Sequence, residues 1–132
     1  MAAALNHVRA AWQAQPTFSS YRAAAATVEQ LHLRGQLVFT NGVFDLLHAG
    51  HLRSLEYARG LGDALVVGLN SDISVNGLRR AGRPVIGQFA RAELLAALRC
   101  VDAVIIFDEP EPLGLIKTVR PDIPVSYTHL TL

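Results

Sequence analysis

The stretch TNGVFDLLHAGH at residues 40–51 decides the fold, because it reads as a strand end, a turn and a helix start. It follows the apolar run Leu37–Phe39, which is typical of a short strand buried on both faces. Gly42 permits a turn in which the backbone approaches a ligand closely. Beyond the turn, Ala49–Leu61 carries apolar residues at helical spacing, and Gly62 ends the predicted helix.

Strands and helices alternate on both sides of this stretch. Upstream, Ser19 or Ser20 caps a predicted helix that runs to Arg34 and ends at Gly35. Downstream, the pattern predicts strands at Ala64–Leu69 and Ala103–Phe107, helices at Gln88–Leu98 and Glu111–Val119, a polar loop at Asn70–Gly87, and the start of a fourth strand at Pro121–Val125. Strands that alternate with helices pair in parallel through right-handed crossovers. We therefore predict an α/β, doubly wound parallel sheet.

Composition restricts the class of protein further. The 132 residues suffice for one domain, and 51% of them are hydrophobic, which argues against disorder. A net charge of +1 gives no electrostatic case for a nucleic-acid or membrane-surface partner. The single Cys100 excludes an intramolecular disulfide, and no apolar run reaches the about 18 residues of a membrane span. We expect a cytoplasmic protein that binds neither nucleic acid nor membrane.

The two histidines of the stretch are the first candidates for chemistry. His48 and His51 stand three residues apart where the helix begins, so their imidazoles can share one face. The helix start adds unpaired N–H groups and a partial positive charge, which favour a phosphate chain. Gly50 removes a side chain that would block a triphosphate lying across the helix end. Histidine suits phosphoryl transfer because it donates hydrogen bonds and can carry charge near neutral pH.

An isolated pair of histidines has other interpretations. The pair can be structural or incidental, or it can bind zinc together with a carboxylate such as Asp45. The zinc interpretation is disfavoured because the HExxH form is absent and no cysteines assist, so we predict no metal held by the protein. Neither a GxGxxG nor a GxxxxGK[ST] pattern is present, which disfavours a dinucleotide dehydrogenase and a P-loop enzyme.

The stretch Thr40–His51 resembles the signature of the HxGH cytidylyltransferase-like nucleotidyltransferase superfamily. From Gln36 to about Ile123 the chain resembles, almost without gaps, the adenylyltransferase domain that acts on D-glycero-β-D-manno-heptose 1-phosphate (ADP-heptose synthase domain). The segments that support this closer resemblance are Leu61–Asp63, Val67–Asp72, Gly82–Pro84, Arg91–Glu93 and Leu98–Asp102. The resemblance implies a Rossmann-like fold of the HIGH type.

The resemblance also implies a reaction and its participants. ATP and heptose 1-phosphate would give ADP-heptose and pyrophosphate in lipopolysaccharide core precursor synthesis, with ATP as substrate and Mg²⁺ assisting. The partners implied are small molecules, a second copy of the chain in a homodimer, and a sugar kinase that is either fused or separate. Two alternatives stay open: a glycerol-3-phosphate cytidylyltransferase-like enzyme, and a non-catalytic nucleotide-binding fragment.

Roles follow from the resemblance at matching positions. His48 and His51 would contact the triphosphate and steady the transition state as the catalytic pair. The nucleotide-binding residues would be Thr40, Asn41, Gly42, Val43, Phe44, Asp45, Gly50, Asn70, Asp72 and Arg91, with Asp45 orienting the site or its metal and Arg91 holding phosphates. Simpler interpretations exist for three of them. Asp72 can cap a turn, Arg91 can be a solvated helix residue, and Phe44 suits core packing better than base stacking.

The chain departs from the family pattern in three regions. Before Arg91 the family tends to be acidic, whereas this chain has Gln88, Phe89 and Ala90. Leu78-Arg79-Arg80 stands where the family has a Leu-Lys-Gly stretch. Pro124 falls inside an expected parallel strand, where a missing N–H is poorly tolerated, and the residues after it do not resemble the family. We therefore divide the chain into a helical leader at residues 1–18, a nucleotidyltransferase domain at 19–125, incomplete at its C-terminus, and a non-native tail at 126–132.

Overall fold

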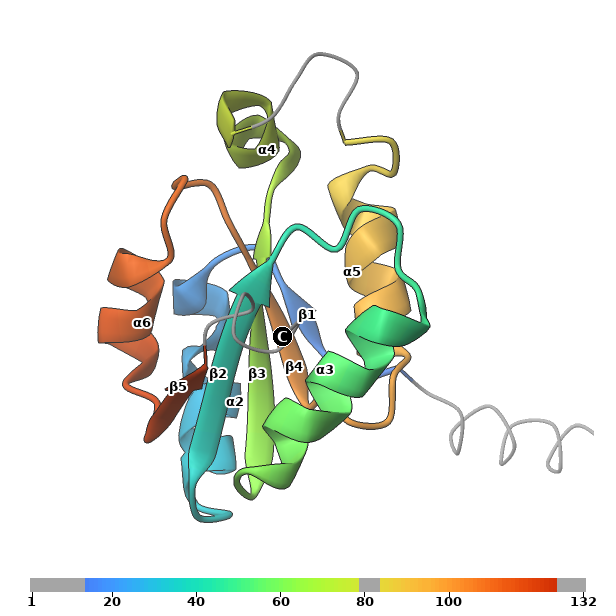
Figure 1. The fold of residues 1–132 in the computed structure, drawn as a ribbon. Helices are drawn as coiled ribbons and strands as arrows, with labels where there is room; N and C mark the ends of the chain where they lie inside the picture. The colour runs from blue at the N-terminus through green and yellow to red at the C-terminus, as the bar shows by residue number, and fades with distance from the viewer. Residues whose placement is uncertain (1–13, 79–83, 126–132) are drawn as a thin grey trace, which may run out of the picture.

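A parallel β-sheet forms the centre of the computed structural model, which describes residues 14–78 and 84–125 (Figure 1). Within these residues five strands pair in the order β1-β4-β3-β2-β5, and every pairing is parallel. The strands are β1 Thr17–Phe18, β2 Leu37–Gly42, β3 Ala64–Asn70, β4 Ala103–Phe107 and β5 Ile123–Val125. The predicted α/β architecture with a doubly wound, Rossmann-like parallel sheet is confirmed.

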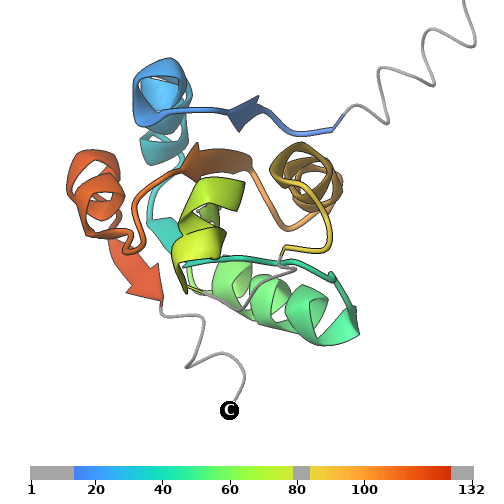
Figure 2. The same ribbon diagram turned by 90° about the horizontal axis from the view of Figure 1, so that it is seen from above.

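The helices cover the sheet on both faces. The described helices are α2 Tyr21–His32, α3 Ala49–Gly60, α4 Asp72–Leu78, α5 Gln88–Ala96 and α6 Leu113–Val119. Of these, α4 lies beyond the carboxyl ends of the strands (Figure 1). The view from above shows α3 and α5 on one side of the sheet, with α2 and α6 on the other (Figure 2). None of the described helices is long and apolar enough to cross a membrane.

Two apolar layers hold these helices to the sheet, because alternate residues of a strand point to opposite faces. The layer under α3 and α5 contains Val38, Leu55, Ala58, Leu65, Val67, Leu69, Ala92, Leu95, Val104 and Ile106. The layer under α2 and α6 contains Ala24, Val28, Leu31, Leu37, Phe39, Val66, Ile105, Phe107, Leu115 and Val119. Burial of each large side chain contributes about 1.5–3 kcal/mol, so these layers supply most of the favourable free energy of folding.

Most predicted elements lie within a few residues of their observed bounds, but the segment after β3 was predicted wrongly. We expected a polar loop over Asn70–Gly87, and the structure has helix α4 over Asp72–Leu78 within it. Ser71 caps this helix: its hydroxyl accepts the backbone N–H of Ser74 at 3.3 Å. Asp72 in the first turn adds a favourable charge at the helix start. The glycines and asparagine in this segment concealed the cap.

The two ends of the described chain also differ from expectation. Thr17–Phe18 form a strand paired with β4, although they fall within the range 1–18 assigned to a helical leader. Residues 1–13 of that leader and the tail at 126–132 lie outside the described residues. Pro124 belongs to β5 despite its missing N–H. It is tolerated because β5 is an edge strand of the described sheet, and a proline's nitrogen can face the side without a ladder partner.

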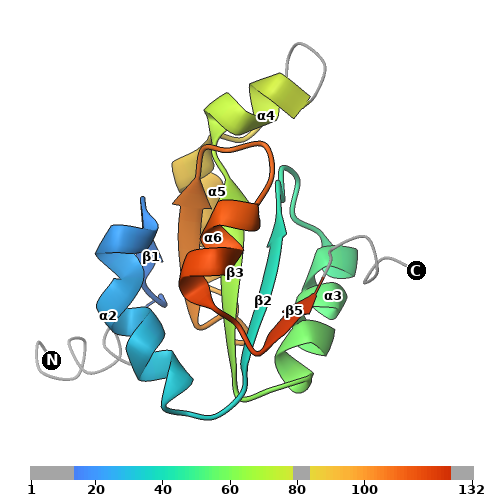
Figure 3. The same ribbon diagram turned by 90° about the vertical axis from the view of Figure 1, so that its left-hand side faces the viewer.

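The strand order fixes where a ligand can bind. From β2 the chain moves through β3 to β4 on one side, and it then crosses over to place β5 on the other side of β2. Figure 3 shows α6, which makes this crossover, lying in front of the sheet. In open α/β sheets ligands bind outside the carboxyl ends of the strands where the order reverses. Here that point lies between β2 and β5, beside the loop that leads to α3.

Candidate functional site

The first turn of α3 is built from the two histidines of the motif. His48 is the N-cap residue, and its Nδ1 accepts the backbone N–H of Gly50 at 3.0 Å. In return, Nδ1 of His51 accepts the backbone N–H of His48 at 3.1 Å. The two side chains therefore close a reciprocal capping box, a role usually taken by Ser or Thr with Glu.

This capping arrangement selects the tautomer of both neutral rings. Because each Nδ1 accepts a hydrogen bond, the neutral imidazole carries its proton on Nε2. The ring centroids lie 3.9 Å apart, so the two rings stand together at the helix start. Burial, and secondly the charge of His48, lowers the pKa of His51 below its ordinary value of 6.5. The neutral form of each ring thus keeps one N–H donor, on Nε2.

Phe44 and the two motif glycines fit around these rings. Phe44 is 4% exposed, takes a φ of 49°, and meets the His51 ring edge-on at 5.6 Å between centroids. A Cβ at Gly50 would lie 2.7 Å from Cε1 of His48, and a Cβ at Gly42 would lie 2.8 Å from Cε2 of Phe44. The packing interpretation of Phe44 is therefore supported, and Gly50 makes room first for the His48 ring.

Asp45 connects the motif to a segment forty residues later in the chain. Its Oδ2 accepts the backbone N–H of Val85 at 3.0 Å, and its Oδ1 accepts that of Ile86 at 2.9 Å. Sequence patterns did not reveal this segment as part of the site, because it contributes backbone groups that any residue carries. Among the described residues there is no group of three or more His, Cys, Asp or Glu side chains that could hold a metal ion.

Arg91 is buried beneath the same loop, with 1% of its surface exposed. Its Nε donates to the carbonyl of Ile86 at 2.8 Å, and its Nη1 donates to the carbonyls of Val43 at 2.7 Å and Asn70 at 2.8 Å. Its Nη2 donates to Oδ1 of Asp72 at 2.7 Å. The sequence assigned Arg91 and Asp72 to the nucleotide site separately, and the structure joins them in an ion pair. The interpretation of Arg91 as a solvated helix residue is wrong, because the side chain is buried.

The remaining predicted residues lie at the carboxyl ends of β2 and β3. Asn41 is half-buried and lines a hollow of about 470 Å³ at the point between β2 and β5, together with Glu111 and Ile116. Thr40 is 0% exposed and Asn70 is 3% exposed. Among the described residues, the Thr40 hydroxyl and the Asn70 side-chain nitrogen have no hydrogen-bond partner. Asn41 therefore lies at a hollow beside α6, whereas the side chains of Thr40 and Asn70 are buried.

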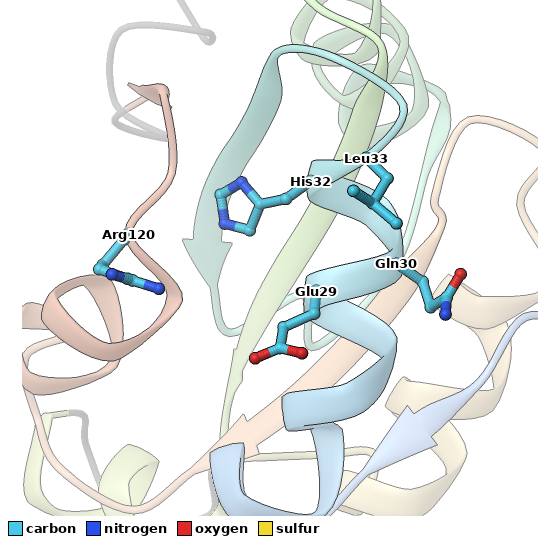
Figure 4. Close-up of a pocket in the computed structure, with 5 residues that line it drawn as sticks. All are labelled: Glu29, Gln30, His32, Leu33 and Arg120. Atoms are coloured by element: carbon cyan, nitrogen blue, oxygen red, sulfur yellow. The ribbon is translucent and has the colours of Figure 1, made fainter.

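A second pocket, of about 550 Å³, lies between the C-terminal ends of α2 and α6, away from the motif. Figure 4 shows Glu29 and Arg120 reaching into the gap between these helices. His32 joins the helices through its Nε2, 2.9 Å from the carbonyl oxygen of Val119. Because the lining carries one acidic and one basic side chain, it does not favour a polyanion as the helix start at His48 does.

The fold and this geometry define a class of protein: an α/β domain with a Rossmann-like parallel sheet and a histidine-capped helix start after β2. The chain belongs to the cytidylyltransferase-like family, whose model matches residues 39–131. It is 59% identical over 105 residues to the bifunctional protein HldE of Geotalea uraniireducens, covering 79% of this chain and 21% of that protein. It is 55% identical over 97 residues to HldE of Geobacter sulfurreducens, covering 74% and 20%.

Solved structures lead to the same group. The lipopolysaccharide core biosynthesis protein from Thermoplasma volcanium aligns with a TM-score of 0.62 and 32% identity, covering 67% of this chain and 71% of that one. The chain spans about a fifth of the length of the HldE relatives, with 21% and 20% of their lengths covered. The family and these relatives support a nucleotidyltransferase enzyme as the class to which this domain belongs.

Proposed function

We propose that this domain transfers the adenylyl group of ATP to heptose 1-phosphate, forming ADP-heptose and pyrophosphate in lipopolysaccharide core precursor synthesis. A phosphate oxygen of the sugar phosphate attacks the α-phosphorus of ATP. The bond from that phosphorus to the bridging oxygen breaks, and pyrophosphate leaves with the electron pair. The HldE relatives, and the structural relative named for lipopolysaccharide core biosynthesis, support this choice of pathway.

The observation that carries the proposal is the histidine capping box, in which both Nδ1 atoms accept backbone N–H groups and each neutral ring keeps its proton on Nε2. In our proposal His48 and His51 donate to the phosphates and stabilise the charge that builds during transfer. The motif backbone from Asn41 to Phe44 and the N–H groups at the start of α3 complete the nucleotide site. Loss of one preorganised donor from such a site costs about a hundred- to a thousand-fold in rate.

Mg²⁺ enters this proposal with the nucleotide. The described residues offer no carboxylate cluster, and both oxygens of Asp45 accept backbone N–H groups. Mg²⁺ in nucleotide sites is commonly held by substrate phosphates and water with few protein ligands. In this proposal the motif residues bind and orient the phosphates, and Mg²⁺ bound to the nucleotide would offset part of the phosphate charge.

The relatives bear on partners and location as well. Because they are named bifunctional and this chain matches about a fifth of their length, we propose that a sugar kinase, fused or separate, supplies the phosphorylated sugar. We further propose a homodimer and a cytoplasmic location, where ATP and sugar phosphates are available. Sedimentation analysis of the purified protein tests the dimer.

The reaction is tested by pyrophosphate release with ATP and CTP supplied separately, each with heptose 1-phosphate and with glycerol 3-phosphate. We expect turnover with ATP and heptose 1-phosphate, and its loss in His48→Ala and His51→Ala. Gly60→Ala is a suitable control, since a Cβ there meets nothing within 4 Å. Turnover with CTP alone contradicts the proposal in favour of a cytidylyltransferase, and calorimetric binding of ATP without turnover favours a nucleotide-binding module.

A further inference from the structure

We propose that Arg91 and Asp45 are positioning residues that clamp the segment Pro84–Gly87 onto the motif loop, and thereby hold the histidine pair in its donor geometry. The inference rests on the proposed function only in so far as that geometry serves phosphate binding. It gives Arg91 a different task from the direct phosphate contact that the family resemblance implied.

Asp45 and Arg91 bind the Val85–Ile86 segment from two sides. Asp45 accepts both N–H groups of this dipeptide, at 3.0 and 2.9 Å. Arg91 binds the carbonyl of Ile86 at 2.8 Å. Two side chains of opposite charge thus satisfy consecutive backbone groups in an irregular segment, which fixes that segment without help from a helix or strand.

The same guanidinium reaches the motif loop and the end of β3. Its Nη1 donates to Val43, two residues before Asp45, and also to Asn70. Arg91 therefore joins three backbone segments that are distant in the sequence, at residues 43, 70 and 86. The motif loop is held at Val43 by Arg91 and at Asp45 by the Val85–Ile86 backbone, directly before the histidines. A planar guanidinium can bridge several carbonyls in this way, whereas an ammonium group acts as a point charge.

Electrostatics also argue against direct phosphate contact. The Arg91 side chain is 0% exposed, and its charge is paired with Asp72 at 2.7 Å. A substrate phosphate would have to displace these bonds inside a buried environment, where an unpaired carboxylate or carbonyl costs free energy. The Asp72 side chain is 40% exposed at the outer edge of this pair. The guanidinium is thus oriented inward, toward the loops that it holds.

The test compares Arg91→Met, Arg91→Lys and Asp45→Asn with the unaltered protein. Arg59→Met is the matched control, because Arg59 also binds a carbonyl and a carboxylate, those of Gly62 and Asp102, at the opposite end of the strands from the motif loop. The readouts are circular dichroism for folding, ¹⁵N imidazole NMR for the state of His48 and His51, and calorimetric affinity for ATP and inorganic triphosphate. The NMR readout needs no ligand, so it remains informative even if the unaltered protein fails to bind ATP.

A positioning role predicts that all three variants keep their secondary structure but change the imidazole signals of both histidines. The affinity for ATP and for triphosphate should fall about tenfold or more, and Arg91→Lys should not restore it. Asp45→Asn is decisive, because removing a negative charge strengthens phosphate binding by simple attraction, whereas loss of positioning weakens it. Arg59→Met should behave as the unaltered protein in all three readouts.

Two results would overturn the proposal. The first is triphosphate affinity restored by Arg91→Lys with unchanged histidine signals, which would make Arg91 a direct phosphate ligand. The second is unaltered histidine signals in both Arg91→Met and Asp45→Asn. If Arg91→Met fails to fold, Asp45→Asn and Arg91→Lys carry the same comparison with milder changes.

Discussion

The amino ends and the carboxyl ends of the parallel strands use the same hydrogen-bonding chemistry for different purposes. We call them the amino edge and the carboxyl edge of the sheet. At the amino edge, carboxylates accept the backbone N–H groups at strand starts: Asp63 that of Gln36, Asp102 that of Leu65, and Asp122 that of Leu37. At the carboxyl edge, Asp45 and Arg91 bind backbone groups of irregular segments. The amino edge completes the regular sheet, whereas the carboxyl edge arranges loops around the histidines.

The difference shows that residues important for stability and residues important for ligand binding can lie at opposite ends of the same strands. Asp102 also pairs with Arg34 at 2.9 Å and Arg59 at 3.2 Å, so changes there should alter the free energy of unfolding without reaching the site. Changes at the carboxyl edge should affect ligand binding more strongly than stability. Phe44 is the exception, because it is buried in the core while touching the site.

The largest expected effect is the loss of stability when Phe44 is truncated. Phe44→Ala removes a ring that is 4% exposed, and it should lower the free energy of unfolding by about 3–5 kcal/mol. Urea denaturation followed by circular dichroism measures this change. Phe89→Ala is the control, since Phe89 is 71% exposed and its loss should stay within about 0.5 kcal/mol. Equal effects of the two variants would contradict the core assignment of Phe44.

The next effect tests the amino edge. Asp102→Ala leaves the Leu65 N–H and two arginines without their carboxylate, so we expect a loss of stability of about 1–3 kcal/mol. The affinity for ATP, measured below the unfolding transition, should be unchanged. A fall in affinity with intact stability would show that the two edges are not separate.

A smaller effect on stability, but a larger one on binding, is expected at Gly50. In Gly50→Ala the new Cβ would lie 2.7 Å from Cε1 of His48, so the ring must move and the cap is lost. We expect about 0.5–2 kcal/mol of destabilisation together with loss of phosphate binding. Gly60→Ala, at the other end of the same helix, has open space and should bind normally. Normal binding by Gly50→Ala would exclude a functional role for the His48 ring position.

The smallest effect is on pH dependence. Burial and the neighbouring His48 hold the pKa of His51 below 6.5, so the unfolded chain takes up this proton more readily than the folded one. The contribution of the neutral His51 ring to the free energy of unfolding is therefore complete above pH 6.5. It is lost as the pH falls through the lower pKa of the folded state. NMR titration of the ring measures this. In His48→Asn the pKa of His51 should rise part of the way back, and a fall would contradict the assigned cause.

Sequence patterns located most of the fold, because buried strands and amphipathic helices have short-range signals. Strand Ala103–Phe107 was predicted with its observed bounds, and Ser20 caps α2 as expected. The strand at Thr17–Phe18 was missed because two residues carry no period, and pairing with β4 is what makes them a strand. Helix α4 had a local signal in Ser71, but the glycines and asparagine nearby outweighed it in our interpretation.

The candidate site divides in the same way. Spacing alone placed His48 and His51 on one helix turn, and the structure brings their rings to 3.9 Å. The hydrogen-bond partners of Arg91 could not be predicted from the residues next to it in the sequence. They come from segments around residues 43, 70 and 86. A buried arginine of this kind is recognised only when the chain has brought several carbonyls together.

The contact between Gly50 and His48 links the choices available at two positions. Because the missing side chain at residue 50 accommodates the imidazole of residue 48, the glycine is required by its neighbour rather than by the helix. Replacing His48 by a smaller residue removes that requirement, and alanine at position 50 then becomes the better helix former. Substitutions at the two positions should therefore be strongly non-additive, and homologous chains lacking the first histidine should be free to lose the glycine as well.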